Sequence, residues 1–136
     1  METKAFKHQY AMIIDDEELD NFLNEKLMVF NHFSKHIYKH NSAVSALAFL
    51  NELKTKGPEA LSAFPEVIFI DLNMPVVDGF QFIESLNKLV AQLKIQTQLV
   101  VLTSSVAQKD RDKISEINPD YLFVTKPLSS EWLQAN

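Results

Sequence analysis

Four short stretches of this sequence place chemically useful side chains directly after an apolar run. The runs end at Asp15-Asp16, at Asp71, at Thr103 and just before Lys126. If the runs are parallel strands of one sheet, their carboxyl ends bring these groups together. Three neighbouring carboxylates repel one another unless a cation joins them, and hard oxygen ligands suit Mg²⁺. Since a lysine and a threonine hydroxyl can bind phosphoryl oxygens, the set predicts phosphoryl transfer to a carboxylate.

The elements that must position these groups alternate along the chain. Apolar runs at 10–14, 67–70 and 99–102 are typical of strands buried on both faces. A more polar strand is expected around Ile37-Tyr38, as at a sheet edge, and a fifth strand over 121–124. Segments with helical spacing of apolar residues lie between and after the strands. Five strands and five helices predict a parallel sheet with helices on both of its faces.

The helix patterns predict which residues face the core. For the helix after Asp16, the predicted inward stripe is Leu19, Leu23, Leu27 and Phe30. For the helix capped by Ser42, the predicted stripe includes Val44, Leu47, Ala48, Phe49 and Leu53. Residues 55–65 are predicted to form a long connection, and the last helix, opened by Ser129-Ser130, has room for about two turns.

The composition limits the classes of function. A chain of 136 residues suits one domain, here 1–136 with a core of about 8–134. The net charge of -5 gives no electrostatic footprint for nucleic acid, and the absence of Cys excludes disulfides and thiolate chemistry. Because no apolar run has the length of a membrane span and no signal peptide is recognised, we expect a cytoplasmic protein with no membrane partner.

The chain resembles the receiver domain of two-component response regulators over nearly all of its length. The matching stretches are Ile13 to Glu17, Ile70 to Pro75 with Asp78-Gly79, Leu102 to Ser104, and Val124 to Pro127. The resemblance implies a flavodoxin-like, doubly wound α/β fold with the strand order 2-1-3-4-5. The same resemblance implies a phosphorylation-dependent signalling switch that uses Mg²⁺.

The resemblance also implies a role for each site residue. Asp71 would be the phosphoacceptor, and Asp16, Asp71 and the backbone carbonyl of Asn73 would bind Mg²⁺, with Asp15 acting through a water molecule. Thr103, Ser104 and Lys126 would bind the phosphoryl group. Phe123 would turn inward when Thr103 moves, although it lacks the hydroxyl of the tyrosine often found there. This movement would change the surface made by the helix at 106–117, the strand at 121–124 and the last helix.

The implied partners are a phosphoryl donor and a downstream protein. The donor would be a histidine kinase, a phosphotransfer protein or a small acyl phosphate. The downstream protein is not identified by the sequence, and the chain is expected to be a monomer or a phosphorylation-dependent dimer. It would not be an enzyme beyond Mg²⁺-dependent self-phosphorylation and slow self-dephosphorylation.

Two other functions remain open at this point. A receiver-like interaction domain working without phosphorylation would have the same fold. A haloacid-dehalogenase-like phosphatase would need an acid two residues after its nucleophile, where this chain has Asn73, which cannot donate a proton. His32, His36 and His40 recur every fourth residue, but they span a predicted helix end and a strand, so we expect ordinary surface or packing histidines.

Overall fold

The predicted strands lie side by side in one parallel sheet. The computed structural model describes residues 5–72, 79–104 and 108–136. Its strands are β1 (His8–Ile14), β2 (Ser34–His40), β3 (Val67–Asp71), β4 (Gln98–Thr103) and β5 (Leu122–Thr125). Their order is β2-β1-β3-β4-β5, and each neighbouring pair is parallel. The expected order is therefore confirmed, with the polar strand β2 at an edge.

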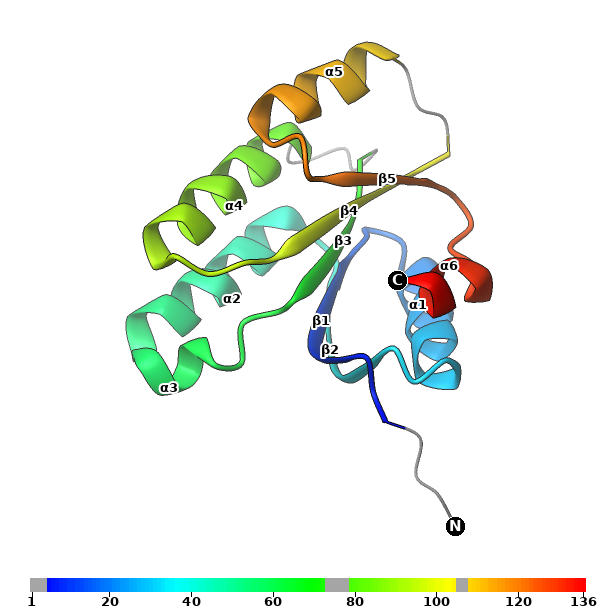
Figure 1. The fold of residues 1–136 in the computed structure, drawn as a ribbon, viewed down its shortest axis with the longest axis horizontal. Coiled ribbons are helices and arrows are strands. Elements are labelled where there is room, and N and C mark those ends of the chain that lie inside the picture. The colour runs from blue at the N-terminus through cyan, green and yellow to red at the C-terminus, as the bar shows by residue number, and fades with distance from the viewer. Residues whose placement is uncertain (1–4, 73–78, 105–107) are drawn as a thin grey trace.

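Helices cover both faces of this sheet. They are α1 (Glu18–Phe30), α2 (Ala43–Lys56), α3 (Pro58–Leu61), α4 (Gly79–Leu93), α5 (Gln108–Ile117) and α6 (Ser130–Ala135). Figure 1 shows α1 and α6 next to each other on one side of the sheet, while α2 and α4 lie on the other. None of the helices in the described part of the chain is long and apolar enough to cross a membrane.

Each central strand contributes to two cores. In β1, Ala11 and Ile13 pack with Met28 of α1, whereas Met12 and Ile14 pack toward α2 and α4. The strands β3 and β4 alternate in the same way, and their apolar residues are at most 5% exposed. Because both faces of the sheet are covered, the strands need continuous apolar runs, and this explains the pattern seen in the sequence.

The stretch 55–65 was wrongly predicted to be only a connection. The helix α2 continues to Lys56, and the short helix α3 then begins at Pro58. Gly57 joins them with a φ of 99°, a conformation that favours glycine. The described residues therefore form six helices where five were expected.

The predicted inward face of α1 was also wrong. Leu19, Leu23 and Phe30 are 65%, 52% and 77% exposed, and only Leu27 of that stripe packs against a core. The buried residues are instead Asn21 and Met28. The Asn21 side-chain amide donates hydrogen bonds to the backbone carbonyls of Asp15, at 2.9 Å, and His40, at 3.2 Å. These bonds turn Asn21 toward the sheet, so the apolar stripe faces outward.

The helix α2 differs from its prediction in a smaller way. Val44 is 60% exposed and Ala48 is also exposed, so neither belongs to the inward stripe. Ala43, Ala46 and Leu50 are buried in their place, while Leu47, Phe49 and Leu53 pack against the core as expected. The predicted cap Ser42 is confirmed, since its Oγ accepts the Ser45 N–H. Ser129, expected at the start of the last helix, is the N-cap of α6, and its Oγ accepts the Trp132 N–H.

Candidate functional site at the carboxyl edge of the sheet

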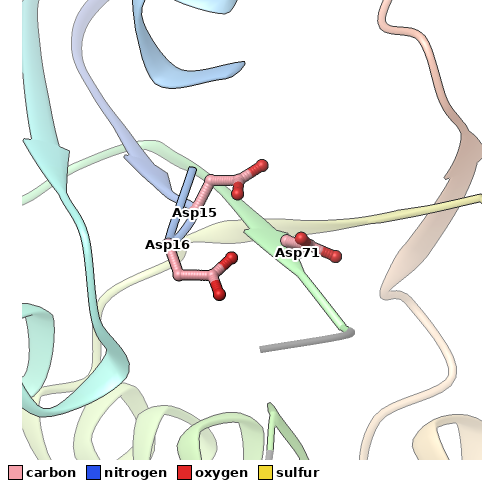
Figure 2. Close-up of side chains that lie close together, drawn as sticks. All are labelled: Asp15, Asp16 and Asp71. Atoms are coloured by element: carbon pink, nitrogen blue, oxygen red, sulfur yellow. The ribbon is translucent and has the colours of Figure 1, made fainter. Parts of the chain in front are cut away.

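Three carboxylates meet where β1 and β3 end. Asp15 and Asp16 follow β1 directly, and Asp71 is the last residue of β3 (Figure 2). One carboxylate oxygen from each residue lies within 4.8 Å of the other two. Asp15 and Asp71 are 1% and 5% exposed, whereas Asp16 is exposed to solvent. The site therefore has two buried acids and one at its mouth.

Backbone contacts fix the position of Asp15. Its N–H donates to the carbonyl of His40 at 3.1 Å, which continues the pairing of β1 with β2. Its Oδ1 accepts the backbone N–H of Glu17 at 3.0 Å, and its own carbonyl accepts the Asn21 amide at 2.9 Å. The Asp15 carboxylate is therefore held toward the site before any ligand arrives.

Lys126 connects the carboxylates. Its Nζ lies 3.2 Å from Asp15 Oδ2 and 3.1 Å from Asp71 Oδ2. Its backbone N–H donates to the carbonyl of Thr103 at 2.8 Å, which extends the pairing of β4 with β5 by one residue. The pairing of β5 with β4 therefore positions Lys126 next to the acids, as predicted from the ends of the strands.

A fourth acid of the site, Asp20 of α1, was not predicted from the sequence and is the third anionic partner of Lys126. Its Oδ2 lies 3.5 Å from the same lysine nitrogen, and its side chain is 41% exposed. Asp20 lies in the first turn of α1, which begins at Glu18, so the helix that follows Asp15-Asp16 brings it to this edge of the sheet.

Burial and the neighbouring charges shift the pKa values of Asp15 and Lys126. Burial raises the pKa of Asp15, with a further contribution from Asp71, and the opposing effects of the Glu17 N–H and Lys126 are smaller in sum. Burial alone would lower the pKa of Lys126, but its hydrogen bond to Asp71 and the charges of Asp15 and Asp71 raise it. The lysine therefore stays charged, and the carboxylates around it still outnumber it.

The donor set fits a hard divalent cation. Opposite ligands of a Mg²⁺ ion lie about 4.2 Å apart, because each ligand is about 2.1 Å from the metal. Oxygens of Asp15, Asp16 and Asp71 within 4.8 Å of one another match that spacing after a small adjustment or with a bridging water. Among the described residues they form a group of acids that could hold a metal ion. Asn73, the other predicted ligand, lies outside the described residues.

The remaining predicted residues lie on or next to the strands β4 and β5. Thr103 ends β4 and is fully buried, and Ser104 follows it at the surface. Phe123 of β5 is half-buried, and the Arg111 guanidinium lies 5.5 Å from the centre of its ring. The three histidines contact aromatic rings instead of joining the acids: His32 lies near Phe6, His36 stacks on Tyr10, and His40 lies near Phe49.

Comparisons with known proteins agree with this arrangement. The family model of the response regulator receiver domain matches residues 11–136. A two component response regulator from Cytophaga hutchinsonii has a similar structure, with a TM-score of 0.78 and 28% identity, covering 98% of this chain and 94% of that one. A response regulator receiver protein from Dyadobacter fermentans DSM 18053 is also 28% identical, with a TM-score of 0.73 and 93% of both chains covered.

A much longer curated protein matches this chain in sequence over a small part of its own length. The chain is 30% identical over 121 residues to hybrid signal transduction histidine kinase D of Dictyostelium discoideum. The match covers 87% of this chain but only 7% of that kinase.

Proposed function

Because this chain belongs to the response regulator receiver family of two-component systems, we propose that it is a phosphorylation-dependent signalling switch with Asp71 as the phosphoacceptor. The observation that best supports this proposal is the environment of Asp71. This residue is 5% exposed, its Oδ2 lies 3.1 Å from the Lys126 ammonium, and two further acids lie at the same edge of the sheet. A carboxylate nucleophile needs such a positive charge to receive an anionic group. In this proposal residues 1–136 form one receiver domain.

The proposed reaction moves a phosphoryl group onto Asp71. A carboxylate oxygen attacks the phosphorus of a phosphohistidine or an acyl phosphate, and the bond to the donor breaks as the leaving group takes the electron pair. Lys126 pairs with a phosphoryl oxygen and Thr103 donates its hydroxyl to another. Asp16, Asp71 and the Asn73 carbonyl would hold Mg²⁺, with Asp15 acting through a water molecule, and the ion when bound offsets charge on the phosphoryl oxygens.

We assign the output to the surface of α5, β5 and α6. Phosphorylation adds a charge of about −2 beside Thr103 and Lys126. If Thr103 moves toward the new group, Phe123 can turn into the space that it leaves. The Arg111 guanidinium over the Phe123 ring favours the present, half-buried position, because cation–π contacts stabilise it. In the phosphorylated state the Phe123 ring then loses its contact with Arg111 and becomes buried. A downstream protein binds the surface altered in this way.

The outward face of α1 supports a protein donor. Leu19, Phe22 and Leu23 are at least 50% exposed and lie in the first two turns of α1, directly after Asp16. A phosphohistidine must come within bonding distance of Asp71, so its protein has to bind beside this edge of the sheet. We assign the α1 face to a helix of a histidine kinase or phosphotransfer protein, since apolar helix faces pack well on one another.

Intact-mass spectrometry tests the proposal. The parent chain, Asp71→Asn and the remote control Asp120→Asn are incubated with acetyl phosphate and Mg²⁺. We expect a gain of about 80 Da, one phosphoryl group, in the parent and in the control but not in Asp71→Asn. A parent chain that neither gains this mass nor binds beryllofluoride would instead be an interaction domain working without phosphorylation.

A further inference from the structure

The three anionic partners of Lys126 are not equivalent. Its Nζ lies 3.2 Å from Asp15 Oδ2 and 3.1 Å from Asp71 Oδ2, and both of these carboxylates are almost fully buried. The third, Asp20 Oδ2, lies 3.5 Å away on α1, and its side chain is 41% exposed. Asp20 is therefore a partner at the rim of the site, outside the three acids that form the metal cluster.

The lysine and a metal ion compete for the same oxygens. A divalent cation held by Asp15 and Asp71 would stand close to an ammonium that already contacts both carboxylates, and like charges at such distances repel strongly. Binding of the ion must therefore weaken the contacts of Lys126 with Asp15 and Asp71. The Lys126 side chain is only 24% exposed, so an ammonium that loses these contacts without a replacement is poorly solvated.

We infer that Asp20 is a positioning residue for Lys126: it anchors the ammonium at the rim and so lets Mg²⁺ take the oxygens of Asp15 and Asp71. This inference rests on the proposed function, because it assumes that the metal binds there. The ion pair of Lys126 with Asp20 can persist when the other two are weakened. Asp20 thereby favours metal binding through the lysine, without touching the metal.

Two simpler roles of Asp20 have to be separated from this one. An acid in the first turn of a helix is favourable to the helix dipole, which would affect stability alone. A carboxylate near the site also attracts a cation directly, through its field. Neither role needs Lys126, so a double-mutant cycle between Asp20 and Lys126 distinguishes them from positioning.

The experiment is a calorimetric Mg²⁺ titration of the parent, Asp20→Asn, Lys126→Ala and the double variant. We expect Asp20→Asn to raise the Kd for Mg²⁺ about two- to five-fold, the range that a partly exposed ion pair supports. Lys126→Ala should lower the Kd, because it removes the competing charge. In the Lys126→Ala background, Asp20→Asn should then change the Kd by less than about 1.5-fold.

Two further variants complete the design. Asp20→Glu keeps a carboxylate within reach of Lys126 and should retain a Kd close to that of the parent. Glu18→Gln removes one negative charge from the same helical turn, and within the described part of the chain Lys126 pairs with Asp15, Asp20 and Asp71 but not with Glu18. We expect its effect to be clearly smaller than that of Asp20→Asn.

Three results would overturn the positioning role: no effect of Asp20→Asn, the same effect with and without Lys126, or an equal effect of Glu18→Gln. These failures leave the proposed function intact, since the mass gain of the parent and its loss in Asp71→Asn are measured separately. A parent chain that binds no Mg²⁺ at all would remove the metal site and this inference together.

Discussion

Asp16→Asn should stabilise the metal-free protein and reduce its stabilisation by Mg²⁺. Asp16 is exposed, and one of its carboxylate oxygens lies within 4.8 Å of oxygens of Asp15 and Asp71. Coulomb's law gives about 0.9 kcal/mol of repulsion for each such pair at the dielectric constant of water. Loss of the favourable interaction of Asp16 with the N-terminus of α1 costs about 0.3–1 kcal/mol. The net gain in the free energy of unfolding is therefore about 1 kcal/mol.

The assay is urea unfolding followed by fluorescence of the single tryptophan, Trp132. Its ring packs 5.7 Å from that of Phe69 and 6.4 Å from that of Phe33, so it reports on the core between the sheet and α6. Low salt with a chelator shows the repulsion, and about 1 M salt, with a Debye length near 3 Å, should remove most of the gain. The matched control is Glu84→Gln, which removes an exposed charge from α4.

Addition of Mg²⁺ tests the same reasoning from the opposite side. At ten times its Kd, the ion should raise the free energy of unfolding of the parent by about 1.4 kcal/mol. Asp16→Asn should show a clearly smaller increase, because one of the three carboxylates has become neutral. The reasoning is refuted if Asp16→Asn is no more stable than the parent with chelator, or if Mg²⁺ stabilises both chains equally.

Three further predictions follow from burial and exposure. Phe82→Ala should lower the free energy of unfolding by about 3–5 kcal/mol, since this ring is 0% exposed; a loss below about 1 kcal/mol in urea unfolding would contradict its place in the core. Phe22→Ser should change stability by less than about 0.5 kcal/mol and leave uptake from acetyl phosphate unchanged, yet slow transfer from a phosphotransfer protein; Val44→Ser, on α2, is the control. Burial lowers the pKa of His40 from its usual 6.5, so the unfolded state binds the proton more tightly and stability should fall as the pH drops below that value. His40→Gln should reduce this loss between about pH 7.5 and 5.5, and identical pH profiles would exclude the histidine as its cause.

Most of the sheet was predictable because strands buried on both faces have a simple pattern. The runs at 10–14, 67–70 and 99–102 lack the alternation of apolar and polar residues that a sheet with one solvated face requires. They therefore indicated parallel strands that are covered on both faces. Parallel strands align their carboxyl ends, and residues that follow those ends are gathered whatever their separation in sequence. The grouping of Asp15, Asp16, Asp71 and Lys126 was predicted in this way.

The orientation of α1 was not predictable from its apolar spacing. The helix has apolar residues on two sides, and the more apolar side, with Leu19, Leu23 and Phe30, faces solvent. The inward side is decided by hydrogen bonds of Asn21 to carbonyls at the ends of β1 and β2, and these carbonyls become neighbours only in the folded sheet. The contact of Asp20 with Lys126 likewise forms only in the folded chain.

The sequence by itself therefore determined the parallel α/β architecture and the chemistry at the carboxyl edge, because both depend on the ends of strongly apolar strands. Only the tertiary structure decided which side of α1 is exposed and which acids contact Lys126. These features depend on pairs far apart in sequence, such as Asn21 with His40 and Lys126 with Asp15. Local periodicity carries no information on such pairs, since their energies arise only when the elements pack together.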